Sequence, residues 1–94
     1  MSISYEDIIS NNKIIDIRNN ISFLEYHLNN SINIKRIELL SNPEKYIKKD
    51  EITYLICDEG TASLSTAKVL NALGYNCYSI EGGLEKIKKI NSIK

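Results

Sequence analysis

Short hydrophobic runs alternate along the chain with longer stretches whose apolar residues recur at helical spacing. The runs predict strands at Ile14–Ile17, Ser31–Ile34, Ile52–Ile56 and Cys77–Ile80, and those at 14–17 and 52–56 are rich in β-branched residues. Because the run at 52–56 is continuous and apolar, we expect it to form a central strand. Strands separated by helices indicate βαβ units. We therefore expect an α/β fold with a parallel sheet and helices on both faces.

Helical spacing is clearest over Ser63–Leu73, where Ala67, Leu70 and Leu73 fall on one face and Gly74 follows as the C-terminal cap. Weaker helical patterns cover Ile21–Leu28, Ile37–Leu40, a turn at Glu44–Lys48 opened by Pro43, and Leu84–Ile90. The pair Gly82-Gly83 predicts a turn before the last of these helices. No linker or repeat interrupts the pattern, so we expect one domain over residues 1–94.

The composition is typical of a small globular domain. A chain of 94 residues that is 43% hydrophobic and 26% charged can enclose a single core. The 12 Lys and Arg residues balance the 12 Asp and Glu residues, which argues against a nucleic-acid partner bound by bulk positive charge. Arg18 and Arg36 are the only arginines, so we do not expect several arginines to clamp one anion.

The N-terminal sequence and the cysteines limit the compartment and the chemistry. The first residues show no basic stretch followed by an apolar core, and no run reaches the about 18 apolar residues of a membrane span. We therefore expect a cytoplasmic protein without membrane contact. Cys57 and Cys77 are too few for a disulfide framework, and with the single His27 they do not predict a zinc site.

Cys57 lies where functional sites of parallel sheets form, directly after the predicted central strand and before the predicted helix. Gly60 allows the intervening loop to curl with a positive φ, so that successive backbone N–H groups converge. Those groups and the positive end of the helix favour an anionic sulfur and an anionic exchange partner. Position alone fits equally well a small apolar residue buried at the end of a strand.

The loop from Cys57 to Ser63 resembles the active-site loop of rhodanese-type sulfurtransferases, Cys-x-x-Gly-x-x-Ser, in which Arg often precedes the Ser. Other segments are similar to family motifs in the same order and spacing, namely Ile14–Arg18, His27, Ser31–Ile34, Leu73–Tyr75 and Glu81–Gly83. Each match is weak alone, but together they extend from about Ile14 to Ile90.

The resemblance implies a mostly parallel, five-stranded sheet flanked by helices, and a cysteine that carries sulfane sulfur. Cys57 would take sulfur from thiosulfate or a persulfide and hold it as a persulfide. The loop residues that would bind this group through backbone N–H groups are Asp58, Glu59, Gly60, Thr61, Ala62 and Ser63. A thiol, cyanide or a cysteine of a partner protein would remove the outer sulfur, and no metal or organic cofactor is implied.

At this loop the chain also departs from the family. Asp58 and Glu59 place two carboxylates after the cysteine, which disfavours a thiolate and repels an anionic donor. Ala62 stands where the family often has Arg, and Leu84-Glu85-Lys86 replaces a small residue followed by Trp. We therefore expect slow thiosulfate turnover that Ala62→Arg or Asp58→Lys would speed. Backbone N–H groups, rather than side-chain cations, should hold the anion.

The other chemistry-bearing residues have simpler interpretations. We interpret Asp16, Arg18 and His27 as structural supports that fix loops by hydrogen bonds. Cys77 opens a predicted strand and should pack as a small hydrophobic residue. The hydroxyls of Thr61 and Ser63 can donate to a bound anion, and Ser63 can cap its helix.

Other functional classes compete with sulfur transfer. A phosphatase fits poorly, because Cys-x5-Arg enzymes clamp phosphate with an Arg at the position that Ser63 occupies. A sugar-transport phosphocarrier fits poorly too, since its Cys follows the first strand, whereas Cys57 lies past the middle of the chain. A catalytically silent rhodanese-like module that binds or senses a partner stays open as the alternative, because the loop is acidic.

Overall fold

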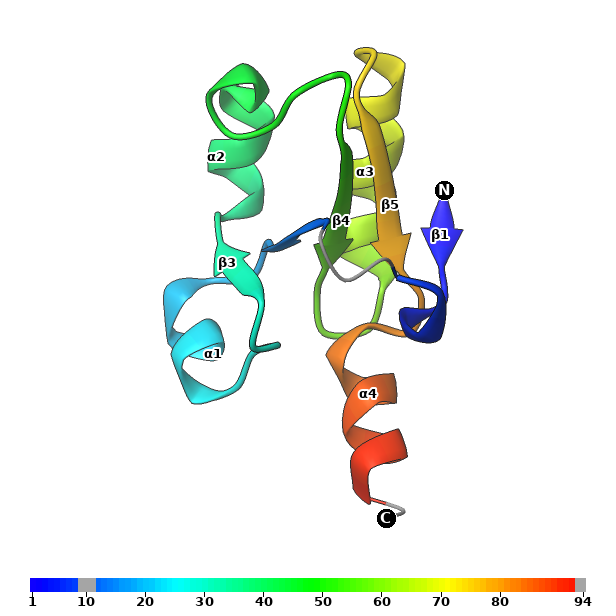
Figure 1. Ribbon diagram of the computed structural model, residues 1–94. Coiled ribbons are helices and arrows are strands. Elements are labelled where there is room, and N and C mark those ends of the chain that lie inside the picture. The colour runs from blue at the N-terminus through cyan, green and yellow to red at the C-terminus, as the bar shows by residue number, and fades with distance from the viewer. Residues whose placement is uncertain (9–11, 93–94) are drawn as a thin grey trace.

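A single five-stranded sheet in the order β1-β5-β4-β2-β3 forms the centre of the molecule (Figure 1). The computed structural model describes residues 1–8 and 12–92 of the chain. The strands are β1 (Ser2–Ile3), β2 (Lys13–Asp16), β3 (Ser31–Asn33), β4 (Ile52–Ile56) and β5 (Asn76–Ile80). They pair in parallel, which confirms the α/β fold class and places β4 in the middle.

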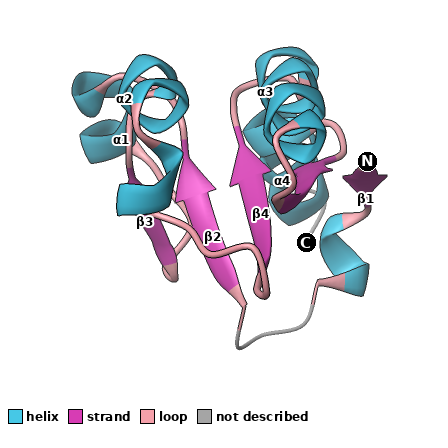
Figure 2. Cartoon of the chain, turned by 90° about the horizontal axis from the view of Figure 1, so that it is seen from above, coloured by secondary structure: helices cyan, strands magenta, loops and turns pink. Residues whose placement is uncertain are grey.

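Helices connect the strands, as the alternation predicts. They are α1 (Asn20–Glu25), α2 (Arg36–Ser41), α3 (Thr61–Ala72) and α4 (Gly83–Ser92), with 3-10 turns η1 (Tyr5–Asp7) and η2 (Pro43–Lys45). Seen from above, α1 and α2 lie on the β3 side of the molecule, whereas α3 and β1 lie on the other side (Figure 2). No helix in the described ranges has the length and apolar character that a membrane span requires.

The side chains of successive residues in the central strands belong to two separate hydrophobic clusters. Ile15 of β2 and Leu55 of β4 belong to a buried cluster with residues of α2 and α3. Their neighbours Ile14 and Tyr54 belong to a second cluster with residues of α4. Because side chains alternate across a strand, this division means that both faces of the sheet are covered, as expected for parallel strands.

The C-terminal end of α3 follows the predicted capping pattern. Gly74 has φ +99°, and the Tyr75 N–H donates to the Leu70 carbonyl oxygen at 3.0 Å, which is typical of a glycine-terminated helix. Of the three residues predicted on one face, Ala67 and Leu70 are buried, whereas Leu73 is 51% exposed. Leu73 is the C-cap residue of α3, where the chain turns towards β5.

Several boundaries differ from the sequence prediction. α3 begins at Thr61 instead of Ser63, because Gly60 adopts the left-handed conformation that ends the loop earlier. Gly83, predicted as a turn residue, begins α4. The predicted turn at Glu44–Lys48 is the 3-10 turn η2. Hydrophobic periodicity did not predict β1, since a strand of 2 residues shows no period.

Candidate active site around Cys57

The Cys57 sulfur lies in a cradle of backbone N–H groups at the C-terminal end of β4. Its side chain is buried, and its Sγ accepts N–H hydrogen bonds from Gly60 at 3.1 Å and from Ser63 at 3.3 Å. The curl that brings these donors together depends on Gly60, whose φ of +96° is strained for any residue with a side chain. The geometry matches the predicted curled loop and suits a negatively charged sulfur.

Two buried serine hydroxyls form a hydrogen-bonded network with the Cys57 sulfur on its core side. The Cys57 thiol donates to Ser63 Oγ at 3.2 Å, and Ser63 Oγ lies 2.6 Å from Ser79 Oγ of β5. Both hydroxyls can also donate to the Gly60 carbonyl oxygen at 3.3 Å. If Cys57 loses its proton, the Ser63 hydroxyl can rotate to donate to the sulfur. The predicted cap by Ser63 is wrong, because Gly60 is the N-cap residue of α3 and the Ser63 hydroxyl belongs to this network.

The start of α4 holds the loop from the other side. The Leu84 N–H donates to the Cys57 carbonyl oxygen at 3.0 Å, and the Glu85 N–H donates to the Asp58 carbonyl oxygen at 2.9 Å. Gly83 allows this close approach, since a Cβ there would lie 2.5 Å from the Cys57 oxygen. The Gly-Gly pair thus has a physical role, because it lets one backbone pack against another.

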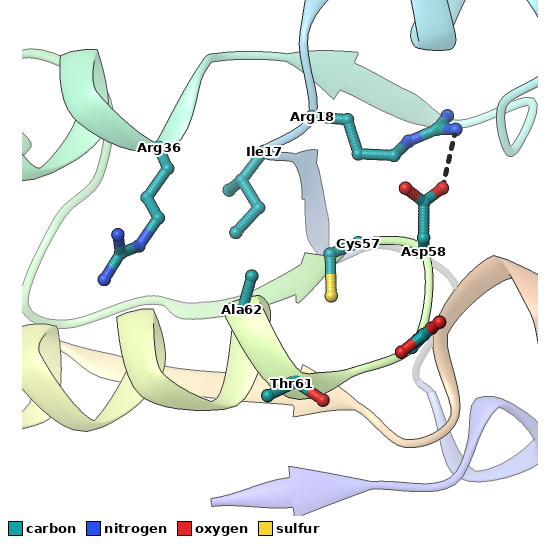
Figure 3. A pocket seen from close by; sticks show the side chains of 8 residues that line it. Ile17, Arg18, Arg36, Cys57, Asp58, Thr61 and Ala62 are labelled. Carbon is teal, nitrogen blue, oxygen red and sulfur yellow. Dashed lines mark hydrogen bonds and ion pairs between the residues drawn. The ribbon is translucent and has the colours of Figure 1, made fainter.

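Arg18 connects the loop to the end of β2. Its guanidinium donates to the buried Asp16 carboxylate at 2.7 and 2.9 Å and to the Tyr26 carbonyl oxygen at 2.6 Å. It also pairs with the exposed Asp58 carboxylate at 3.3 Å (Figure 3). The pKa of Arg18 is raised chiefly by its hydrogen bonds to Asp16, against an opposing effect of burial. Arg18 therefore offsets part of the negative charge that Asp58 brings to the loop.

A pocket of about 320 Å³ opens beside the sulfur. Its wall consists of Ile17, Arg18, Arg36, Cys57, Asp58, Glu59, Thr61 and Ala62 (Figure 3). Of the predicted loop residues, Gly60 and Ser63 do not line the pocket. Their backbone N–H groups donate hydrogen bonds to the Cys57 sulfur instead. Two arginines, Arg18 and Arg36, belong to the pocket wall, whereas the prediction that backbone N–H groups hold the anion stays a prediction. Sequence reasoning missed Arg36, which comes from a helix distant in sequence.

His27 lies away from the sulfur. Its Nδ1 is 2.6 Å from the Phe23 carbonyl oxygen, and its ring stacks on that of Phe23 at 3.8 Å between centroids. It lines a separate cavity with Tyr5, Tyr26 and Ile87. The hydrogen bond and the stacking are of the kind that a structural support makes.

Cys77 is a second free thiol, placed on β5. It is 1% exposed, and burial raises its pKa to about 11. Its N–H donates to Asn71 Oδ1 at 2.8 Å, which ties the strand to α3. Cys77 therefore has the environment of an unreactive core thiol.

Residues 4–90 match the family model described as the rhodanese-like domain. The chain belongs to the rhodanese-like domain family. Among solved structures it is similar to a rhodanese-related protein from Thermoplasma volcanium, with a TM-score of 0.81 and 29% identity. That alignment covers 94% of this chain and 91% of the other. The predicted family and rhodanese-like fold are thus confirmed.

Two longer proteins contain a similar segment. The adenylyltransferase and sulfurtransferase uba4 of Ogataea parapolymorpha is 35% identical over 72 residues, which are 76% of this rhodanese-like chain and 18% of the relative. Bacillus anthracis CoADR-RHD shares the fold with a TM-score of 0.80 and 24% identity, over 89% of this chain and 16% of that one. The chain therefore spans a small part of the length of these relatives.

Proposed function

We propose that this rhodanese-like protein is a sulfurtransferase or sulfur carrier that holds sulfane sulfur as a persulfide on Cys57. The observation that carries the proposal is the pair of N–H hydrogen bonds from Gly60 and Ser63 to Sγ beside an open pocket. Such donors stabilise negative charge on sulfur before the reaction begins. The named sulfurtransferase activity of the uba4 relative supports the same chemistry.

Sulfur transfer then takes two displacement steps. The Cys57 thiolate attacks the outer sulfur of thiosulfate, the S–S bond breaks, and sulfite leaves with the electron pair. The product is a Cys57 persulfide anion beside the N–H groups of the loop. A thiolate, cyanide or a cysteine of a partner protein attacks the terminal sulfur and releases the Cys57 thiolate. The steps balance without a metal or organic cofactor. The two free cysteines, Cys57 and Cys77, suit a reducing compartment such as the cytoplasm.

Thiosulfate should be a slow donor. The Glu59 side chain lines the pocket as an acid, and Ala62 supplies no cation at the first turn of α3. The Asp58 charge opposes the donor less than expected from the sequence, because Arg18 pairs with it. Like charges near the reacting sulfur still disfavour the approach of a doubly charged anion.

Intact-mass measurement tests the proposal directly. The purified protein is incubated with thiosulfate and, separately, with a small persulfide, and we expect an added mass of one sulfur atom. Cys57→Ser should abolish the adduct, whereas the matched Cys77→Ser should keep it, because Cys77 is buried in the core. An adduct that survives in Cys57→Ser would contradict the proposal.

A silent binding module is the second candidate. The acidic pair Asp58 and Glu59 at the pocket wall is the observation that favours it. In that case no donor would leave a sulfur adduct, although Cys57 would still react with a small alkylating agent. Alkylation of Cys57 without sulfur transfer from any donor would therefore favour the module over the carrier.

A further inference from the structure

Arg36 differs from Arg18, the other cation that lines the Cys57 pocket. Arg18 is engaged by Asp16, Tyr26 and Asp58, so its charge is already paired. Arg36 donates only through Nε, to Thr66 Oγ1 at 2.9 Å, among the hydrogen bonds of the described residues. Its two terminal nitrogens therefore keep their N–H donors for a ligand.

The Arg36 side chain is also held in place. Thr66 is fully buried, and its hydroxyl donates to the Ala62 carbonyl oxygen at 2.7 Å while it accepts from Arg36. This pair of bonds ties the guanidinium, which starts from α2, to the first turn of α3. A planar guanidinium fixed at one nitrogen presents the remaining donors in a defined direction, as recognition of a carboxylate or sulfonate requires.

Apolar surface separates this cation from the reactive sulfur. Figure 3 shows the side chains of Ile17 and Ala62 between Arg36 and Cys57, and all of them line the same pocket. A ligand that touches both ends therefore needs an anionic group and a sulfur joined by a short apolar spacer. Thiosulfate does not meet this requirement, because its sulfonate is bonded directly to the sulfur that moves.

We propose that Arg36 is the specificity-determining residue for the sulfur donor, and that it binds the carboxylate or sulfonate of a small thiol persulfide. The inference rests on the proposed persulfide chemistry and names its donor class. The Cys57 thiolate attacks the outer sulfur of the donor R–S–SH, the S–S bond breaks, and R–S⁻ leaves with the electron pair. The product is Cys57–S–SH, so atoms and charge balance without an oxidant.

A donor series tests the role of Arg36. The probes are the persulfide of 3-mercaptopropionate, that of its uncharged amide, and that of 2-mercaptoethanesulfonate. We expect the wild-type protein to take sulfur about five to ten times faster from an acid than from the amide, the size of one charge-assisted contact at an exposed site. Initial rates of Cys57 persulfidation are read from intact mass, and the ratio of the two acids shows which anion is preferred.

Arg36→Met should remove the preference for the acids, so that the ratio of the rates with acid and amide falls to about one. Lys35→Met is the matched control, because Lys35 is an exposed cation next in sequence that does not line the pocket. It should keep the preference. Arg36→Lys, which keeps the charge but not the guanidinium geometry, should retain part of it, and circular dichroism shows that each variant is folded.

The outcomes separate this inference from the function on which it rests. Equal rates with the acids and the amide in the wild-type protein, or an unchanged preference in Arg36→Met, would overturn the role of Arg36 and leave the Cys57 persulfide in place. No adduct with any of the donors would overturn both.

Discussion

Ser63 and Ser79 bring their hydroxyl oxygens to 2.6 Å from each other below the Cys57 sulfur, although they come from a helix and a strand of the sheet. Ser63 is fully buried and Ser79 is 1% exposed, so water does not compete for this contact. The pair forms one hydrogen-bonded unit with the sulfur and the Gly60 carbonyl oxygen. The reactive sulfur is therefore supported by the core of the sheet as well as by its loop.

Ser79→Ala tests this support. Ser63 would lose its partner in the core, so we expect unfolding to become easier by about 1–2 kcal/mol and persulfide formation to slow severalfold. Urea denaturation and the rate of sulfur uptake measure the two effects. Ser65→Ala is the control, because Ser65 is an exposed serine of the same helix whose hydroxyl bonds the Ala62 carbonyl oxygen. Wild-type behaviour of Ser79→Ala in both assays would show that this hydrogen-bonded unit contributes neither to the stability of the fold nor to the rate of sulfur uptake.

Gly83→Ala should disrupt the loop from the α4 side. The added Cβ would lie 2.5 Å from the Cys57 oxygen and 2.6 Å from the Asp58 oxygen, so backbone must move. We expect a loss of more than about 2 kcal/mol in the free energy of unfolding. Gly74→Ala is matched to it, since Gly74 also has a positive φ but a Cβ there meets only the flexible Lys49 side chain, at 3.4 Å. That variant should lose about 1 kcal/mol, from backbone strain alone. Equal losses would argue against the packing contact.

Ala62→Arg should make thiosulfate a better donor. A cation at the first turn of α3 would line the pocket and oppose the Glu59 charge, so we expect kcat/KM for thiosulfate to rise about fivefold. Ala72→Arg adds the same charge at the other end of the helix and should change nothing. Asp58→Lys is less specific, because it also removes a partner of Arg18. Fast thiosulfate turnover in the wild-type protein, unaltered by Ala62→Arg, would contradict the electrostatic reasoning.

The buried thiol of Cys77 should make the protein less stable at alkaline pH. Burial raises its pKa to about 11 in the folded protein from an ordinary value of 9.0. Above pH 9 the unfolded chain gives up this proton while the folded chain keeps it, so stability falls between about pH 9 and 11. The fall from this group is at most about 2–3 kcal/mol. Urea denaturation from pH 8 to about 10.5 should show a steeper decline for the wild type than for Cys77→Ala. Parallel profiles would mean that the thiol titrates normally.

Much of the fold was predictable because its signals are local. The short apolar runs identify β2, β3, β4 and β5, and the loop after β4 identifies Cys57 and the N–H cradle. Each of these depends on residues close together in the chain. Among the strands of the described residues, the short β1 was not indicated by the hydrophobic pattern, since its position is determined by pairing with β5.

The missed parts of the site depend on contacts between distant segments. Arg36 and Ser79 belong to α2 and β5, and neither follows a motif that marks it. Arg36 is held at the pocket by its hydrogen bond to Thr66, and Ser79 is linked to the sulfur by its hydrogen bond with Ser63. The pairing of Arg18 with Asp58 was missed for the same reason, because a count of charges along the chain does not show which opposite charges meet.

The contact between the start of α4 and the carbonyl oxygens of Cys57 and Asp58 has a consequence for synthesis of the protein. A ribosome releases Cys57 well before Leu84 and Glu85, so the nascent loop lacks two of the hydrogen bonds that shape it. The hydrogen bonds that hold the loop from the α4 side then form only when α4 emerges and docks. Until this helix is in place, a nascent chain would thus hold Cys57 in a loop that lacks two of its backbone hydrogen bonds.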